Sequence, residues 1–160
     1  MDLSKEYPRS ALERFAGVVM APRTSDKCRA HLQNTLGEYI YNCGLDRQLF
    51  QFLGTDADEF AGIVSRSPDD AGVEAFVREK LAGKSTESIE AFNREFLDYE
   101  PDLSRPSYSG QREALQRRAP ERKDITLWVH LTDMEEGRPV PTEADVREMR
   151  AALAGAAGAA

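Results

Sequence analysis

Residues 45–54 of the chain read LDRQLFQFLG. Its apolar side chains recur three or four positions apart, at Leu45, Leu49, Phe52 and Leu53. This spacing is typical of the buried face of an α-helix. The stretch ends in a glycine, which closes many helices because it adopts a left-handed backbone conformation without strain. The segment therefore predicts a short amphipathic helix with a defined end.

The same combination of a capping residue, an apolar stripe and a stop signal recurs on both sides of this stretch. The first predicted helix rests on Ser10 and Glu13, spaced as a capping box, and on the stripe through Phe15 and Val19. Further predicted helices cover residues 25–34, 55–67, 73–82, 86–100 and 142–153, with a weaker one at 111–119. We therefore expect an all-α fold, a single compact domain of about seven or eight short helices.

Residues 125–131, ITLWVHL, fit two kinds of structure. Apolar and polar side chains alternate along them, as in a half-buried strand, but the segment also fits a helix that is apolar on most of its surface. A lone strand would leave its backbone groups unpaired, so we favour the helix. The alternative is a mostly α fold with one small two-stranded element formed near residues 38–41 and 125–131.

The 160 residues suit one domain, which buries roughly 70% of its unfolded surface. Residues 100–110, EPDLSRPSYSG, are rich in proline and serine and predict a linker loop. It separates a main helical core at 1–99 from C-terminal helices at 111–153, which are too short to form a core alone, so we expect them to dock back on the first part. The Ala- and Gly-rich residues 154–160 predict a flexible tail, so the single helical domain spans 1–153.

Composition excludes several classes of protein. The 28 acidic residues exceed the 21 basic ones, for a net charge of −7, and such a chain is a poor binder of nucleic acid phosphates. The longest run without charged or strongly polar residues, 15–22, is far shorter than the ~20 residues that a membrane span needs. Two cysteines are too few for a disulfide framework and suit a reducing compartment. We therefore expect a cytoplasmic protein with neither nucleic acid nor membrane as a partner.

The charge is unevenly spread, and the first fifty residues are almost neutral, with seven basic and six acidic groups. Several of their polar residues gather near predicted helix starts, where free backbone amides favour an anion. Arg23 and Lys27 stand four apart, on one helix face. With Arg9, Glu38 and Tyr39 they predict a site for an anionic small molecule, in which the cations supply charge and Tyr39 supplies a polar wall.

A plainer interpretation stays open for the same region. Arg23 with Asp26, and Asp26 with Arg29, are spaced as ion pairs on the exposed face of a helix. A second basic stretch, residues 112–123, is interpreted as a solvated face or a partner contact, because no aromatic residues for base stacking are interleaved with it.

Thiol and metal chemistry have weaker candidates. Cys28 and His31 share a helix face at a spacing of three, and with Cys43 they are the candidates for a metal site. Cys43 lies in a loop-like stretch, where its thiol is the candidate for a catalytic nucleophile. The chain has no phosphate-binding glycine loop, nucleophile elbow or closely paired zinc ligands. We expect no cofactor, and an enzyme is the less favoured class.

Short motifs follow one another along the chain: Pro8-Arg9-Ser10, Pro22-Arg23, Asp26-Lys27, Arg29-Ala30, Gly37-Glu38-Tyr39, Asn42-Cys43, Leu45-Asp46, Phe52-Leu53-Gly54, Ile125 to Trp128 and Asp133 to Arg138. Together they resemble an uncharacterised bacterial family, the domain of unknown function DUF 5069, over most of the chain up to Arg138. The resemblance implies a compact bacterial cytoplasmic domain and no assigned reaction. The chain departs from the family pattern at Cys28, where we expect a small residue such as alanine, and at Gly44, where we expect proline. The first departure weighs against a metal at Cys28.

The sequence assigns no reaction, so the function stays unknown at this stage and three hypotheses are open. The first is a small cytoplasmic module that binds an anionic small molecule. The alternative is a helical domain for protein–protein interaction or homodimerisation, which uses an apolar face and the basic stretch 112–123 and has no small ligand. The third is a thiol- or metal-dependent enzyme that uses Cys43 or a bound metal.

Overall fold

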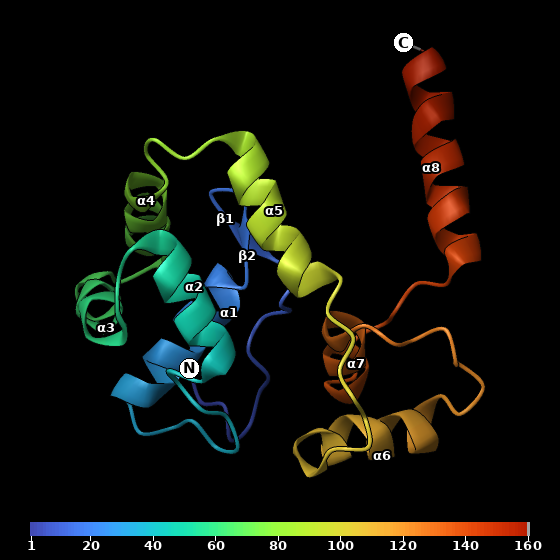
Figure 1. Ribbon diagram of the computed structural model, residues 1–160, viewed down its shortest axis with the longest axis horizontal. Helices are drawn as coiled ribbons and strands as arrows, with labels where there is room; N and C mark the ends of the chain where they lie inside the picture. Colours follow the sequence, from blue (N-terminus) through green and yellow to red (C-terminus); the bar gives the residue numbers. More distant parts are fainter. Residues whose placement is uncertain (160) are drawn as a thin grey trace. The chain divides into compact units, whose positions relative to one another are not determined.

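The computed structural model describes residues 1–159, which contain eight α-helices, one 3₁₀ helix and one two-stranded sheet (Figure 1). The mostly helical fold predicted from the sequence is therefore confirmed. The elements fall into two compact units, Met1–Tyr99 and the chain from Glu100 onward. We call them unit 1 and unit 2 and describe each by itself.

Unit 1 opens with a β-hairpin where the sequence predicts a helix at 10–19, so that prediction is wrong. Strand β1, Arg14–Phe15, pairs antiparallel with strand β2, Val18–Val19. Ala16 and Gly17 join the two strands with φ angles of 49° and 88°. Positive values at both central residues are what the type I′ hairpin turn requires, and the twist of this turn matches that of the strands.

Local sequence explains why the hairpin forms. The turn glycine and the two β-branched valines that follow it favour paired strands over a helix. Ser10, instead of capping a helix, closes a tight turn. The amide of Leu12 donates to the Ser10 hydroxyl oxygen at 3.2 Å, and that of Glu13 donates to the Ser10 carbonyl oxygen at 3.2 Å.

Five helices follow in unit 1: α1 Ala21–Leu32, α2 Gly44–Leu53, α3 Ala57–Arg66, α4 Asp70–Lys80 and α5 Thr86–Leu97. All of them overlap helices predicted from the sequence. Helix α2 covers the stretch LDRQLFQFL, and Gly54 ends it in the left-handed conformation with φ 69°. Helix α1 begins earlier than predicted, because Pro22 lies in its first turn, where a missing N–H costs nothing.

Side chains cap the starts of these helices. Asp56 accepts a hydrogen bond from the amide of Glu59 at 2.8 Å and caps α3 one residue after Thr55, where the predicted helix begins. Ser85 accepts from the amide of Ser88 at 3.1 Å, directly before the predicted start of this helix at residue 86. Each cap satisfies an amide that the helix leaves free, and so gives the helix a defined first residue.

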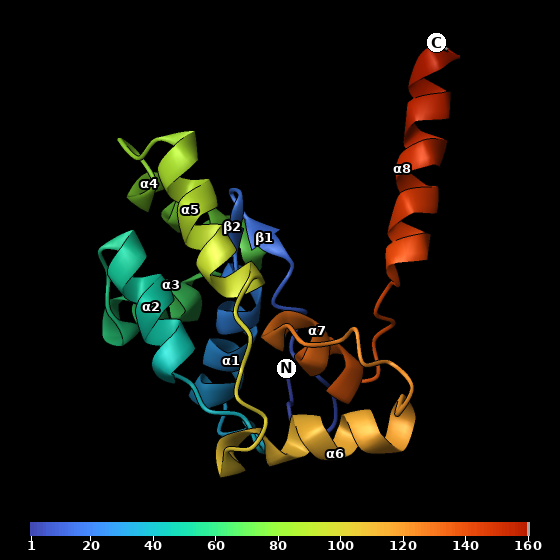
Figure 2. The same ribbon diagram turned by 45° about the vertical axis from the view of Figure 1, so that its right-hand side comes forward.

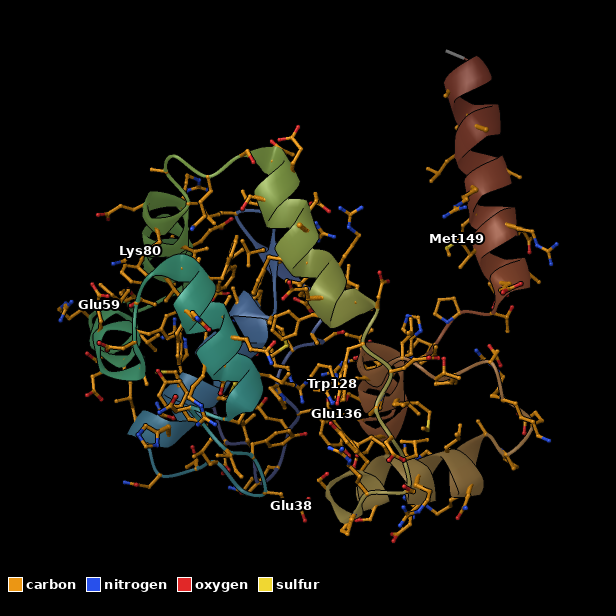
Figure 3. The ribbon with its side chains drawn as sticks, viewed as in Figure 1. Glu38, Glu59, Lys80, Trp128, Glu136 and Met149 are labelled. Carbon is orange, nitrogen blue, oxygen red and sulfur yellow. The ribbon has the colours of Figure 1, made fainter. Side chains whose placement is uncertain are left out.

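The core of unit 1 is built around α1, of whose twelve residues nine are buried. Helix α3 packs on α1, α4 packs on α3, and α5 packs on β2 (Figure 2). Phe60 is fully buried, and its ring lies 5.2 Å from that of Phe50 and 6.2 Å from that of Phe76, between centroids. At the surface Lys80 pairs with Glu59 at 3.2 Å and ties α4 to α3 (Figure 3).

Unit 2 contains the 3₁₀ helix η1, Pro106–Tyr108, and three helices: α6 Ser109–Arg118, α7 Trp128–Glu135 and α8 Glu143–Gly158. Helix α6 packs on α7 around a small apolar cluster. The buried members of the cluster are Ala114, Ile125, Leu131 and Met134. Thr142 caps α8, as predicted, by accepting a hydrogen bond from the amide of Asp145 at 3.1 Å.

The ambiguous segment 125–131 enters a helix. Helix α7 begins at Trp128, and residues 125–127 lead into it without regular structure. The helix that we favoured is therefore confirmed from Trp128 onward. The alternative is wrong in its placement, because the small sheet lies at 14–19, and neither 38–41 nor 125–131 contains a strand.

The predicted linker and tail hold more regular structure than expected. Residues 100–110 include η1 and the beginning of α6. Helix α8 continues through Gly158, into the predicted tail 154–160, whose last residue lies outside the described residues. The docking of residues 111–153 on the first part stays a prediction. None of the described helices is long and apolar enough to span a membrane.

Candidate functional site

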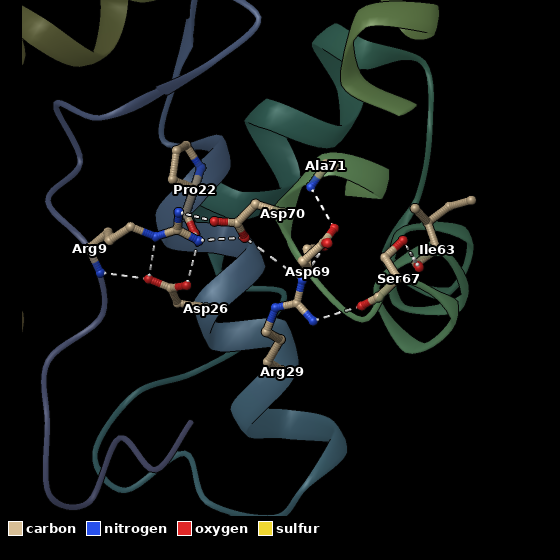
Figure 4. A network of polar contacts seen from close by, with 9 residues as sticks. All are labelled: Arg9, Pro22, Asp26, Arg29, Ile63, Ser67, Asp69, Asp70 and Ala71. Atoms are coloured by element: carbon tan, nitrogen blue, oxygen red, sulfur yellow. Dashed lines mark hydrogen bonds and ion pairs between the residues drawn. The ribbon is translucent and has the colours of Figure 1, made fainter. Parts of the chain in front are cut away.

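The predicted cationic cluster centres on Arg9, which precedes the hairpin and reaches α1 (Figure 4). Its guanidinium binds Asp26 side-on, with Nε donating to Oδ2 at 3.0 Å and Nη2 donating to Oδ1 at 2.8 Å. The backbone amide of Arg9 donates to the same carboxylate at 2.8 Å. On its other edge, Nη1 and Nη2 donate to Asp70 at 2.7 and 3.1 Å. Two carboxylates, one from α1 and one from the start of α4, therefore hold Arg9.

These contacts keep Arg9 charged. Burial lowers the pKa of its guanidinium, but the hydrogen bonds and charges of Asp26 and Asp70 outweigh burial and raise the pKa above its ordinary value. Arg29 joins the network by donating to two backbone oxygens of the turn between α3 and α4, at 3.0 and 2.9 Å (Figure 4). The cluster thus joins α1 to the start of α4 through paired charges.

Lys27 lies on α1 and forms a second, separate ion pair. Its Nζ donates to Asp46 Oδ2 at 2.8 Å, and it lies 3.3 Å from the Ile40 carbonyl oxygen and 3.4 Å from Cys43 Sγ. Asp46 is fully buried on α2 and also accepts a hydrogen bond from the Thr24 hydroxyl at 2.8 Å. An ammonium group has three N–H bonds. Asp46 Oδ2, the Ile40 carbonyl oxygen and Cys43 Sγ account for all three N–H bonds of Lys27.

Arg23 and Tyr39 stack on one another. The Arg23 guanidinium carbon lies 5.5 Å from the centroid of the Tyr39 ring, and Nη1 donates to the Arg9 carbonyl oxygen at 3.0 Å. Tyr39 and the exposed Glu38 line a hollow of about 370 Å³ together with residues 3–7 and a glycine. The structure thus brings Arg9, Arg23 and Tyr39 together, and it places Lys27 in an ion pair of its own.

An anionic ligand at Arg9 or Lys27 would have to displace a carboxylate that the protein itself supplies. Asp26 and Asp46 are both buried. A buried carboxylate that loses its partner is left with an uncompensated charge, which costs several kcal/mol. These two cations are therefore already engaged in internal ion pairs. The binding role of Arg9, Arg23, Lys27, Glu38 and Tyr39 stays a prediction.

The cysteine and histidine candidates lie in separate settings. In the described part of the chain, no group of three His, Cys, Asp or Glu residues could hold a metal ion. Cys28 is completely buried, and burial raises the pKa of its thiol to about 11, against a lowering effect of Tyr41. A buried protonated thiol is a poor nucleophile. His31 is exposed and its ring lies 5.1 Å from that of Tyr41, while Cys43 precedes α2 beside Lys27.

Unit 2 contains a hollow that the sequence did not predict. It measures about 350 Å³, and we call it the arginine hollow because it is lined by Arg118, Arg122 and Arg138. Helix α6 supplies the first of these residues, the segment between α6 and α7 the second, and the segment after α7 the third. Apolar side chains complete the lining, among them Ile125, Met134, Pro139 and Val140.

Two of the three guanidinium groups are paired with acids. Arg122 binds Asp124 through Nε and Nη2, at 2.8 and 2.9 Å. The hydrogen bond from Arg122 lowers the pKa of the Asp124 carboxyl. Arg138 contacts Asp133, at 3.4 Å, and Glu136. These two arginines are therefore held in place with most of their charge balanced.

Arg118 differs from the other two. It is exposed, and its Nη1 donates over 3.4 Å to the carbonyl oxygen of Met134, near the end of α7. Among residues 1–159 no carboxylate lies within ion-pair distance of it. Gly137 lets the guanidinium approach the backbone, because a Cβ there would lie 3.1 Å from Nη1. Most of the five N–H donors of Arg118 are therefore available to a further partner.

Only part of the arginine hollow could be found in the sequence. The basic stretch 112–123 contains two of its arginines, but the sequence alone favours a solvated face or a partner contact there. Arg138 comes from beyond the next helix, and it reaches the same hollow only because α6 packs on α7. No spacing in the sequence signals that juxtaposition.

Comparison with known proteins places the chain in a family. None of the curated proteins matches it. A family model described as "Domain of unknown function (DUF5069)" matches residues 5–138. The matched part includes the ion pairs of Arg9 and Lys27 and all three arginines of the arginine hollow. The motifs quoted above indicated the same family, and the chain therefore belongs to the family of the domain of unknown function DUF5069.

Proposed function

We propose that this protein is a small-molecule-binding module and that its ligand carries an anionic group, a carboxylate or a phosphate, which binds in the arginine hollow. The observation that carries the proposal is Arg118, an exposed guanidinium with one long hydrogen bond and no carboxylate partner among residues 1–159. It stands beside a hollow that two further arginines already line.

The chemistry of the hollow suits such a ligand. A guanidinium binds a carboxylate or phosphate through two parallel N–H···O bonds, which fix the orientation of the anion as well as its position. Arg122 and Arg138 are held by their acidic partners and supply a preformed frame. Arg118 supplies a positive charge that no carboxylate among residues 1–159 balances.

The size and lining of the hollow narrow the ligand further. A volume of about 350 Å³ lies at the small end of the range of about 300–1,000 Å³ for ligand pockets. Ile125, Met134 and Val140 present apolar surface beside the guanidinium groups. We therefore favour a small organic acid or phosphate ester with an apolar part over a bare inorganic ion.

The residues predicted from the sequence remain a second location for the same class of ligand. They are less favoured because Arg9 and Lys27 already bind carboxylates of the protein at 2.8 Å. Glu38 and Tyr39 line the hollow beside residues 3–7, where a lysine and a second glutamate leave no excess of positive charge.

A thermal-shift screen of organic acids and phosphate esters, followed by calorimetric titration of the strongest hit, tests the proposal. Arg118→Gln should weaken binding about 10- to 100-fold, because hydrogen bonds to charged groups contribute about 1.5–3 kcal/mol. Arg117→Gln is the control, because it removes one positive charge from the preceding residue of α6, which does not line the hollow. It should leave the affinity within about twofold.

Three results would contradict the proposal. A hit whose affinity falls equally in both variants would report only the general charge of the surface. A hit that Arg118→Gln leaves unchanged and Arg23→Gln abolishes would lie in unit 1 instead. A screen in which nothing stabilises the wild-type protein would leave the module without an anionic ligand.

A further inference from the structure

Helix α8 presents an apolar face without burying any residue. Met149 and Leu153 leave 51% and 72% of their surface exposed, and none of the residues of α8 is buried. Figure 3 labels Met149 on this helix. Isolated helices of about 12–15 residues are marginal in water, because backbone propensity alone barely offsets the cost of nucleation. With sixteen residues, α8 is close to that limit, so a partner for its apolar face would stabilise it.

The spacing of this face is that of a coiled coil. Val146, Met149, Leu153 and Ala156 follow one another at intervals of three, four and three. These are the a and d positions of two heptads, which form the seam between paired helices. In the same frame Asp145 occupies a g position and Arg150 the following e position, so both flank the seam.

We propose that α8 pairs in parallel with α8 of a second copy of this chain and makes the protein a dimer. In a parallel coiled coil, the g residue of one helix faces the e residue five positions further along the other. Asp145 then faces Arg150 of the second copy, and twofold symmetry repeats the pair. The helix is therefore complementary to itself in charge as well as in apolar surface.

The same charges disfavour two other arrangements. In an antiparallel pair that buries the whole stripe, e residues face one another, so that Arg150 would meet Arg150 of the second copy. A membrane surface is disfavoured because α8 carries three acidic and two basic residues. Helices that lie on anionic lipid carry an excess of Lys and Arg instead.

The seam is short, and one of its four positions is an alanine. Stable interfaces bury about 1,200–2,000 Å² in total, more than two heptads of this composition provide. The dimer is therefore expected to dissociate on dilution. Dimer formation should raise the helix content, because burial of the apolar face stabilises a helix whose length is close to the limit for an isolated one.

Sedimentation equilibrium of the full chain over a wide concentration range tests the proposal. The wild-type protein is expected to show a reversible monomer–dimer equilibrium. Leu153→Glu places a charge in the seam and should weaken the dimer at least about tenfold. Ala151→Glu places the same side chain on the outer face of α8 and should leave the equilibrium within about twofold. Circular dichroism of each variant verifies that the rest of the chain is folded.

The parallel orientation of the two α8 helices is tested with a second pair of variants. Arg150→Glu sets two carboxylates against each other across the parallel seam and should weaken the dimer, whereas Arg147→Glu, at an outer position, should not. A wild-type protein that stays monomeric at every concentration overturns the proposal. A dimer that Leu153→Glu leaves intact overturns it too, because the interface then lies elsewhere. A dimer that Arg150→Glu does not weaken overturns the parallel arrangement.

Discussion

Asp46 links α2 to α1 through its contacts with Lys27 and Thr24. It is fully buried, and it neutralises the buried Lys27 at 2.8 Å. Asp46→Ala leaves the Lys27 ammonium buried without its counter-ion, so we expect the free energy of unfolding to fall by about 3–5 kcal/mol. Urea denaturation followed by circular dichroism measures the change.

Two further variants define what the ion pair contributes. Asp58→Ala removes an exposed aspartate from the first turn of α3 and should cost less than about 1 kcal/mol. Lys27→Met combined with Asp46→Ala removes both charges and should recover part of the loss, because no buried charge is then left unpaired. An Asp46→Ala variant as stable as the wild type would show that the ion pair does not form.

Cys28 makes the free energy of unfolding depend on pH in the alkaline range. Burial raises the pKa of its thiol from 9.0 to about 11, so the folded chain keeps this proton to a higher pH than the unfolded chain does. Rising pH between these two values therefore favours unfolding, by at most about 1.4 kcal/mol for each pH unit. Cys28→Ala should show a smaller loss of stability than the wild type between pH 9 and 10. Equal losses in both proteins would contradict the burial of this thiol.

Asp26 shows where prediction from the sequence fails at the scale of single residues. Its spacing predicted ion pairs with Arg23 or Arg29 along one helix. In the structure it binds Arg9, which lies 17 positions away in the chain. Spacing along a helix identifies residues that can meet on that helix. It does not identify a partner from another segment, such as Arg9, whose guanidinium binds Asp26 with one edge and Asp70 with the other.

Among the elements, the hairpin at 14–19 can be tested with one substitution, because a hairpin and a helix predict opposite changes in the free energy of unfolding. Ala16 adopts a φ of 49°, a left-handed conformation that costs an ordinary residue about 1–2 kcal/mol and glycine almost nothing. Ala16→Gly should therefore raise the free energy of unfolding, by about 0.5–1 kcal/mol after the greater flexibility of glycine in the unfolded chain is counted. In the helix that the sequence predicts for this segment, the same change would lower it by about 1 kcal/mol.

Thermal and urea denaturation of Ala16→Gly and Gly17→Ala together decide between the hairpin and the helix predicted for this segment. Gly17 has a φ of 88°, so alanine there should destabilise the hairpin. A helix would respond in the opposite way to both substitutions. Stabilisation by Gly17→Ala would therefore contradict the hairpin.

Elements were predictable where several local signals agreed. In α2 and α5 the cap or stop residue and the apolar stripe point to the same helix, and both helices form where expected. At 10–19 the spacing of a capping box competed with a turn glycine and two valines, and the hairpin formed. The segment 125–131 shows the same limit, because alternation over a few residues does not separate a strand from the entrance to a buried helix.

At the scale of the whole molecule, positive charge serves two purposes. In unit 1 Arg9 and Lys27 balance buried carboxylates, and in unit 2 Arg118 is left uncompensated. The sequence predicts the candidate site in the first fifty residues, because arginine, lysine and other polar residues gather there near predicted helix starts. It could not show that aspartates from other elements neutralise them, since that depends on how the helices pack.

An NMR titration tests the claim that an anionic small molecule binds in the arginine hollow. Uniformly ¹⁵N-labelled full chain is titrated with the strongest anionic hit of the screen, and the shifts of the backbone amides are mapped onto the sequence. We predict saturable shifts that cluster at residues 118–140, that persist in Arg117→Gln, and that disappear in Arg118→Gln at the same ligand concentration. Shifts that cluster at residues 5–9 and 23–39 instead, or no saturable shifts at all, would contradict the claim.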